Sequence, residues 1–214
     1  MRTRTYILLV VLMVATIGTA DAQHKKRGHQ REFDLEVRGG VNMCQIDGDA
    51  SGNYNKMGFH AGLNTSFPLS DDGSWRFVVE LGLTQKGSRI NSSSLDRTIS
   101  LLYVEMPLML AYDMFDGNKL RVGVGVAPAI LASANVKTDG VYDELHSQNY
   151  KRMDALPICV SLRYKITDHL GIDVRYYNSM LNIAKENGIG TYRISRSNKG
   201  QFNRLVQAGI TIDF

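Results

Sequence analysis

The sequence predicts an all-β fold, an eight-stranded antiparallel up-and-down transmembrane β-barrel with short periplasmic turns and longer outer loops. Three observations predict it. Apolar residues alternate with polar or small residues in eight successive segments, which is the period of a strand with two unlike faces. The connections between these segments alternate between long and short. Aromatic residues gather on the apolar face where the short connections lie.

The N-terminal residues predict export. Two arginines precede an apolar run at 6–17, and a small-residue site at 20–22 follows. This is the order of parts in a secretory signal peptide, so we expect cleavage of residues 1–22 and a mature start at Gln23. The alternative is an uncleaved anchor, but the run is about a dozen residues against the roughly 20 that span a bilayer. No later segment has the apolar length of a spanning helix, and a closed barrel needs none.

Charge and cysteine content narrow the class further. The 214 residues carry a formal net charge of +4, and the basic residues cluster in the leader at 23–32 and otherwise alternate with acids. We therefore expect no nucleic-acid partner. Two cysteines fit an exported protein that does not depend on disulfides. Cys44 is expected at an outer loop and Cys159 inside a strand, so a bridge would form only if their heights match.

The first four strands are predicted because apolar side chains fall on every second position. Strand one sets two acids and an arginine in succession on its polar face. A polar, glycine-bearing connection follows strands one and three, whereas a Ser, Asp and Gly turn joins strands two and three. The predicted strands are 33–43, 57–67, 75–86 and 99–112, joined at 45–56, 68–74 and 87–97.

The last four strands follow the same pattern. Strand five sets valines against glycines and alanines, and strands six and seven are joined by the shortest turn. The predicted strands are 121–130, 156–166, 170–177 and 203–214, preceded in turn by connections at 113–119, 135–152, 167–169 and 185–200. The final strand ends on the aromatic Phe214. We expect it to close the barrel and to be the segment that the barrel-assembly machinery engages.

Alternation alone also fits a soluble lipocalin-like barrel, because a period of two does not say which face is wet. The aromatic residues favour the membrane. They lie on the apolar face at the turn end of their strands, where an aromatic girdle meets a bilayer interface. The predicted interfacial girdle is Phe33, Phe67, Trp75, Tyr112, Tyr164 and Phe214. We therefore expect the apolar face to contact outer-membrane lipid.

The opposite face carries charge. An eight-stranded barrel is about wide enough for its own side chains to fill it. An unpaired buried ion costs on the order of several kcal/mol, so the charges are expected as interlocked ion pairs without a continuous water-filled pore. The predicted lumen ion-pair network is Glu36, Arg38, Arg76, Glu80, Glu105, Arg121, Arg163, Asp173 and Arg175.

Three prolines interrupt the pattern. Pro107, Pro128 and Pro157 lie within predicted strands, where proline removes a donor from the ladder. A closed barrel has no edge strand to hold them. Each therefore predicts a bulge or a locally missing hydrogen bond.

Five short motifs, in this order, cover nearly the whole mature chain. They are Arg38-Gly39-Gly40-Val41-Asn42, Gly58-Phe59-His60-Ala61-Gly62, the stretch 80–87, Tyr103-Val104-Glu105-Met106-Pro107-Leu108, and Arg175-Tyr176-Tyr177-Asn178 ahead of Leu181-Asn182-Ile183. The set resembles the PorT-like outer-membrane β-barrel proteins of Bacteroidetes-type bacteria. The resemblance implies the barrel fold and a proline after the glutamate of strand four. It implies no activity, since roles in secretion or gliding belong to particular members.

Three function classes stay open. The preferred interpretation is a small integral outer-membrane barrel with a filled lumen, non-enzymatic and without a cofactor, with a structural or partner-binding role through its outer loops. A narrow porin-like channel for small solutes is the alternative. An outer-membrane lipid-modifying enzyme is the third, because His60 faces the lumen near the outer end of strand two and His146 lies in a long loop. Against it, the sequence has no Gly-x-Ser-x-Gly turn and no Ser, His and Asp close in register.

Charged residues in the predicted outer loops suggest two further sites, and for both an ordinary solvated loop is the preferred interpretation. Carboxylates there could bind calcium, although their spacing is not that of an EF-hand. A basic group in the last loop could contact lipid phosphates. The carboxylates are Asp47, Asp49, Asp139, Asp143 and Glu144, and the basic group is Arg193, Arg196 and Lys199.

Overall fold

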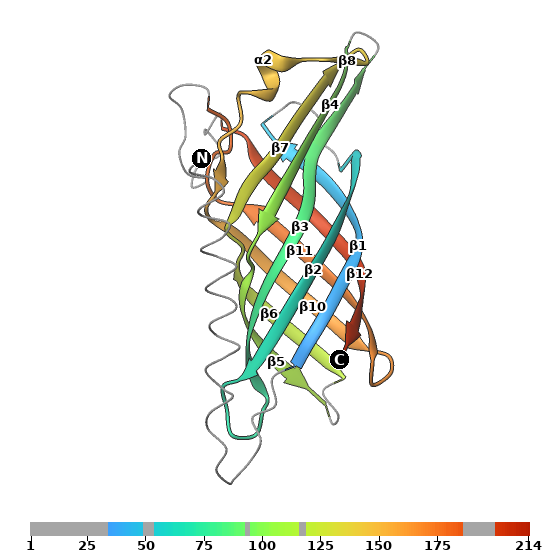
Figure 1. Ribbon diagram of the computed structural model, residues 1–214, viewed down its shortest axis with the longest axis vertical. Helices are drawn as coiled ribbons and strands as arrows, with labels where there is room; N and C mark the ends of the chain where they lie inside the picture. The colour runs from blue at the N-terminus through green and yellow to red at the C-terminus, as the bar shows by residue number, and fades with distance from the viewer. Residues whose placement is uncertain (1–33, 49–53, 93–94, 116–118, 186–199) are drawn as a thin grey trace. The chain divides into compact units, whose positions relative to one another are not determined.

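The structure is a computed structural model that describes residues 34–48, 54–92, 95–115, 119–185 and 200–214. Its strands belong to a single antiparallel sheet (Figure 1). The elements are β1 (Asp34–Asp47), β2 (Lys56–Pro68), β3 (Trp75–Ser92), β4 (Leu95–Glu105), β5 (Leu108–Met114), β6 (Leu120–Val126), β7 (Ala129–Thr138), β8 (Val141–Tyr142), α2 (Glu144–Ser147), β9 (Met153–Asp154), β10 (Pro157–Lys165), β11 (Leu170–Ser179) and β12 (Phe202–Asp213). Within the described ranges, no helix is long and apolar enough to cross a membrane.

The sheet closes on itself. Strand β1 pairs with β2 on one side and with β12 on the other, from Glu36 opposite Asp213 to Asp47 opposite Phe202. The order runs on through β11, β10, β6, β5 and β3, and β3 pairs with β2 again. Because β4 continues into β5, β6 into β7 and β9 into β10, and β8 is a two-residue strand beside β7, the described residues form eight strand paths. The predicted fold class is confirmed.

The prolines lie where these paths are interrupted. Pro107 separates β4 from β5, Pro128 separates β6 from β7, and Pro157 begins β10. The proline carbonyls still accept hydrogen bonds from the neighbouring strands: Glu80 N to Pro107 O at 2.9 Å, Met106 N to Pro128 O at 2.9 Å and Ala127 N to Pro157 O at 2.8 Å. The three breaks therefore lie side by side in one row across the sheet. The predicted local loss of ladder bonding is confirmed at Pro107 and Pro128.

Two predicted loops are wrong. The segment 87–97 is not a polar connection, because β3 runs to Ser92 and β4 starts at Leu95. These strands and β7 rise past the ends of the others and form a projecting sheet (Figure 1). Gly87, at the base of this projection, has a φ of +136°, and a Cβ there would lie 2.0 Å from the Ile99 carbonyl oxygen. Polar residues misled the prediction because a strand outside the membrane does not need an apolar face.

The second wrong prediction is the end of the first strand, near Cys44. Strand β1 continues to Asp47, so Cys44 lies inside the barrel and is buried rather than placed at an outer loop. Cys159 faces inward from β10, as predicted. Both cysteines are free. We call the end with the connections 69–74, 115–119 and 166–169 the turn end, and the opposite end the loop end.

Burial alternates along the strands as the sequence predicts. Val41, Val124 and Ile210 are 49%, 54% and 53% exposed, and they belong to a band of outward apolar side chains around the ring. Their neighbours in sequence are buried, small or polar. Soluble monomers rarely expose continuous apolar area beyond a few hundred Å². The outer face is therefore suited to hydrocarbon and the inner face to polar packing.

An apolar cluster closes the loop end of the interior. Ile99, Leu101 and Val136 from the projecting sheet pack with Tyr150 and Ile183 from the long connections. We call this group, with its further members, the apolar cap. Those members are Ile46, Tyr103 and Ala129, with Leu131 and Ala134 packed against it.

Candidate functional site

The charged side chains of the lumen form four clusters between the turn end and the apolar cap. Their order can be followed along β3, which contributes Arg76 to the first, Glu80 to the third and Lys86 to the fourth. Each position faces inward because it falls on the buried phase of its strand. The clusters are therefore stacked along the inside of the barrel.

The first cluster lies at the turn end. Arg121 donates to both oxygens of Asp113, at 2.5 and 2.9 Å. Arg76 donates to Asp34 Oδ2 at 2.7 Å and lies 3.9 Å from Asp113. Two arginines thus share two carboxylates, and Ser66 accepts a further bond from Arg76 Nε at 3.0 Å.

The second cluster contains two carboxylates and one arginine. Arg163 donates to Glu36 at 2.8 Å and to both oxygens of Asp213 at 2.6 Å. Asn64 donates to the other oxygen of Glu36 at 2.8 Å. Since one guanidinium serves two carboxylates from β1 and β12, it reinforces the seam at which the first and last strands pair.

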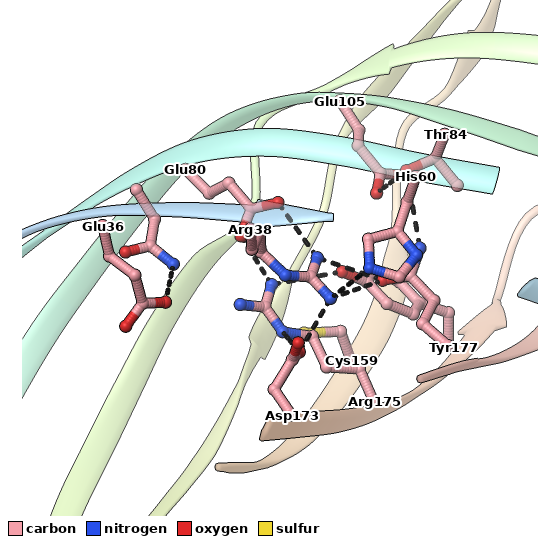
Figure 2. A network of polar contacts seen from close by, with 12 residues as sticks. Glu36, Arg38, His60, Glu80, Thr84, Glu105, Cys159, Asp173, Arg175 and Tyr177 are labelled. Atoms are coloured by element: carbon pink, nitrogen blue, oxygen red, sulfur yellow. Dashed lines mark hydrogen bonds and ion pairs between the residues drawn. The ribbon is translucent and has the colours of Figure 1, made fainter. Parts of the chain in front are cut away.

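The third cluster occupies the middle of the lumen (Figure 2). Arg38 donates to Glu80 at 3.1 Å and to Asp173 at 2.7 Å. Arg175 donates to Glu80 at 2.7 Å, and its Nε forms an ion pair with Asp173 at 3.1 Å. Gln207 accepts from both terminal nitrogens of Arg38 at 3.1 Å. Two cations and two anions form a closed ring of contacts, which is the arrangement that offsets the cost of burying them.

His60 faces the lumen from β2, as predicted, and belongs to this cluster. Its Nε2 lies 3.2 Å from Arg38 Nη2, and its Nδ1 lies 2.7 Å from Asn42 Oδ1. A guanidinium can only donate, so Nε2 of His60 accepts the hydrogen bond from Arg38. Nδ1 therefore carries the ring hydrogen and donates to Asn42 Oδ1. His60 is 3% exposed, and its ring nitrogens are occupied by structural contacts.

The fourth cluster lies beneath the apolar cap. Lys86 Nζ is 3.2 Å from Glu105 and 3.9 Å from Asp154, and its ammonium faces the rings of Tyr103 and Tyr177 at 5.0 and 5.7 Å. One oxygen of each carboxylate also accepts hydrogen bonds: Glu105 Oε1 from Thr84 at 2.5 Å, and Asp154 Oδ2 from Ser179 and Asn203 at 2.5 and 3.2 Å.

Sequence reasoning placed nine charged residues in the lumen, and the structure brings all nine into these clusters. It missed Lys86, Asp113 and Asp154, which are 1%, 6% and 1% exposed. Asp113 had been assigned to a turn, and Asp154 lay between the predicted connection at 135–152 and the strand that starts at 156. Continuing the alternation by one residue past Tyr112 would have placed Asp113 inside. Alternation does not find Asp154, because the buried phase changes between β9 and β10, and Leu156, two residues on, is exposed.

The lumen is filled at the central cluster. Arg38, Glu80, Asp173 and Arg175 are 1%, 2%, 2% and 4% exposed, so water does not reach them along an open path. A cavity beside them, lined in part by Asn64 and Ser161, has a volume of about 20 Å³. That is room for roughly one water molecule.

The aromatic residues predicted as a girdle lie at the turn end of their strands. Trp75 and Tyr112 are paired across β3 and β5, with ring centroids 5.0 Å apart. Tyr164 and Phe214 are 48% and 77% exposed, and Phe67 is half-buried at the end of β2. Phe33 lies outside the described residues.

The loop residues weighed for calcium do not converge. Asp143 caps α2 and pairs with His146 Nδ1 at 2.7 Å, and the hydrogen bond from the backbone N–H of His146 lowers the pKa of that carboxyl. Asp139 accepts from the backbone of Asp96. Among the residues whose positions are described, no group of three acidic, His or Cys side chains could hold a metal. Asp49, Arg193, Arg196 and Lys199 lie outside the described residues.

The family model for the outer membrane protein beta-barrel domain matches residues 21–185. The chain belongs to this family. It is therefore an outer-membrane β-barrel protein, as the filled polar interior and apolar exterior require. No curated protein matches the sequence.

Solved structures similar to this outer-membrane barrel include those of three bacterial proteins. Ail, the attachment invasion locus protein of Yersinia pestis, has a TM-score of 0.49 at 13% identity, covering 86% of this chain and 99% of Ail. Neisserial surface protein A (NspA) has a TM-score of 0.46 at 14% identity, covering 85% and 97%. The outer membrane protein OprG from Pseudomonas aeruginosa has a TM-score of 0.44 at 14% identity, covering 86% and 97%.

Proposed function

We propose that this protein is a non-conducting, non-enzymatic outer-membrane barrel that uses its loop end for structural or partner-binding work. Its lumen is closed by the four ion-pair clusters and by the apolar cap above them. The observation that carries the proposal is the central ring of Arg38, Glu80, Asp173 and Arg175, which is nearly inaccessible to water. A channel needs a wetted path, and this ring leaves none at its level.

The loop end is the face offered to a partner. Val141, Tyr142 and Leu145, next to the projecting sheet, are 71%, 52% and 80% exposed, which is unusual for apolar side chains outside a membrane. We place the turn end in the periplasm because outer-membrane barrels have short turns there. Protease added to intact cells should then cleave in the long connections and spare the turns. Cleavage at the turns alone would reverse this orientation.

Conductance in planar bilayers tests the closed lumen. The purified barrel, inserted from detergent, is expected to give no stable current steps at moderate voltage. Its insertion is verified by faster migration of the unboiled protein on a gel. Stable, ohmic steps would contradict the proposal and favour the alternative of a narrow channel for small solutes.

Lipid modification is the enzymatic rival. His60 supports it poorly, because its ring nitrogens face Arg38 and Asn42 and it is buried. The wild-type barrel is expected to leave phospholipid and ester substrates intact over hours. Turnover by the wild type that is lost in His60→Ala would overturn the non-enzymatic proposal.

The finer assignments are also proposals. We propose that the chain is PorT-like, which the order of the five motifs supports, with Pro107 directly at the strand break after Met106.

We propose cleavage after residue 22. N-terminal sequencing of the mature protein tests this, and any start other than Gln23 would contradict it. We propose that β12, whose neighbour Phe214 points outward, is read by the barrel-assembly machinery. Phe214→Ala should then lower the assembled fraction in cells, and an unchanged fraction would rule this out.

A further inference from the structure

A second cavity lies above the apolar cap at the loop end. Its volume is about 270 Å³, and we call it the mouth pocket. Its lining comes from the projecting sheet (Ile90, Arg97, Ile99, Val136), from α2 (His146) and from Gly48, Asn149, Tyr150, Ala184 and Gln201. For comparison, a protein cavity of about 150 Å³ accommodates benzene. The mouth pocket therefore has room for a ligand of roughly a dozen non-hydrogen atoms.

The floor of the pocket is apolar. Ile99 and Val136, which line it, are 4% and 1% exposed, and Tyr150 is 6% exposed. These residues belong to the apolar cap, so they are held from below by packed side chains. Only a small part of each side chain therefore reaches the cavity, and a ligand that covers this part removes that apolar surface from water, at about 25 cal/mol per Å².

The walls are held by backbone hydrogen bonds. Tyr150 forms a β-bridge with Ala184, and Ile183 N donates to Gln201 O at 2.9 Å. The hydroxyl of Ser147 in α2 accepts from Val136 N at 3.0 Å, which fixes the helix against the projecting sheet. A pocket with fixed walls loses little entropy when a ligand enters.

One arginine is among the residues that line this pocket. Arg97 lines the pocket and donates through Nε to Thr138 Oγ1 at 3.3 Å. Within the described part of the chain, its two terminal nitrogens have no hydrogen-bond partner and it forms no ion pair. No carboxylate is among the described residues that line the pocket. Thr138 Oγ1, which accepts from Arg97, donates in turn to Asp143 Oδ2 at 3.4 Å, and Asp143 pairs with His146 at 2.7 Å.

We propose that the mouth pocket binds a small amphipathic carboxylate. The apolar body of the ligand covers Ile99, Val136 and Tyr150, and its carboxylate pairs with the fork of Arg97, whose geometry matches a carboxylate bidentately. Gln201, which also lines the pocket, carries an amide group that can contact the polar end of the ligand. This site is separate from the ion-pair clusters of the lumen. The conductance experiment therefore does not test it, and its failure would leave the proposal of a closed lumen unchanged.

Binding of 3-phenylpropionate to the full mature barrel in lipid nanodiscs tests the proposal, with empty nanodiscs subtracted to remove partitioning. Saturable binding is expected, and 3-phenylpropionamide should bind at least about tenfold more weakly, because a charge-assisted hydrogen bond contributes more than a neutral one. Absence of saturable binding, or equal affinity for the two compounds, overturns the proposal.

Three variants locate the site. Arg97→Gln should lose the preference for the carboxylate, and Ala184→Phe should block both compounds by filling the pocket. Arg89→Gln is the matched control, since Arg89 lies on the same hairpin and pairs outside with Asp96 at 3.3 Å. Each variant must show the gel shift of a folded barrel. A preference retained in Arg97→Gln, or lost in Arg89→Gln, would rule out this pocket.

Discussion

Arg38 Nη2 and Asp173 Oδ2 lie 2.7 Å apart inside the barrel, although 135 residues separate them in the chain. Arg38 is on β1 and Asp173 on β11, and β12 lies between these strands in the sheet. The pair therefore links β1 to β11 across β12, in addition to the ladders through which β12 pairs with each of them.

Replacing Glu80 by leucine is expected to destabilise the barrel. Glu80 accepts from both Arg38 and Arg175, so Glu80→Leu leaves two buried guanidinium groups short of one anion. Removing one partner of a buried pair costs about 3–5 kcal/mol. Urea unfolding in lipid vesicles, followed by fluorescence of the single tryptophan, Trp75, measures the change.

The control for Glu80→Leu is Asp96→Asn. Asp96 pairs with Arg89 on the projecting sheet, and their side chains are 46% and 47% exposed. Exposed pairs contribute less than about 1 kcal/mol. Equal effects of the two substitutions would mean that the central cluster is not a dry, tightly paired group.

Arg121 and Asp113 allow a test by double substitution. Arg121→Leu removes the bidentate partner of Asp113 and is expected to destabilise the barrel. Adding Asp113→Leu should recover part of the loss, because an apolar pair needs no compensation for buried charge. Recovery will be incomplete, since Arg76 also faces Asp113. The free energies of unfolding of the wild type, the two single variants and the double variant are compared. If the losses of the two single variants simply add in the double variant, Arg121 and Asp113 are not coupled.

Alanine substitutions at two adjacent glycines on β1 should have very different effects on the stability of the barrel. A Cβ at Gly40 would lie 2.2 Å from the Ala208 carbonyl oxygen, whereas a Cβ at Gly39 meets no atom nearer than 3.6 Å. Gly40→Ala therefore forces apart the strands that close the ring and should cost about 2 kcal/mol or more. Gly39→Ala, on the outward face, should be nearly neutral. The fraction that stays compact on unboiled gels separates the two, and similar behaviour would contradict the tight seam.

The two thiols are expected to resist labelling. Cys44 and Cys159 are both 0% exposed, and the Cys159 sulfur lies 3.2 Å from the sulfur of Met109. A maleimide reagent should add to neither in the folded barrel and to both after denaturation. A Val141→Cys variant, at a site that is 71% exposed, controls for reagent access. Labelling of the folded wild type would show that the interior is open to water.

The sequence predicted the face of the sheet on which a residue lies more accurately than the residues that it contacts. Alternation assigns Glu36, Arg38 and Val41 to their sides because the pleat of a strand imposes a period of two. It cannot say that Lys86 meets Asp154, since that depends on tilt and register between strands distant in the chain. Strand ends were also missed, because β3 and β4 continue beyond the membrane, where polar residues no longer mark a loop.

Accessibility of the outward face tests the central claim most directly. Val124 and Ile210, half-exposed on β6 and β12, would each carry a spin label on a single introduced cysteine in a Cys44→Ser/Cys159→Ser background in lipid bilayers. The account predicts frequent collisions with oxygen, which dissolves in hydrocarbon, and rare collisions with a water-soluble nickel complex. Frequent collisions with the nickel complex at both positions would show that this face lies in water and that the barrel does not span the membrane as described.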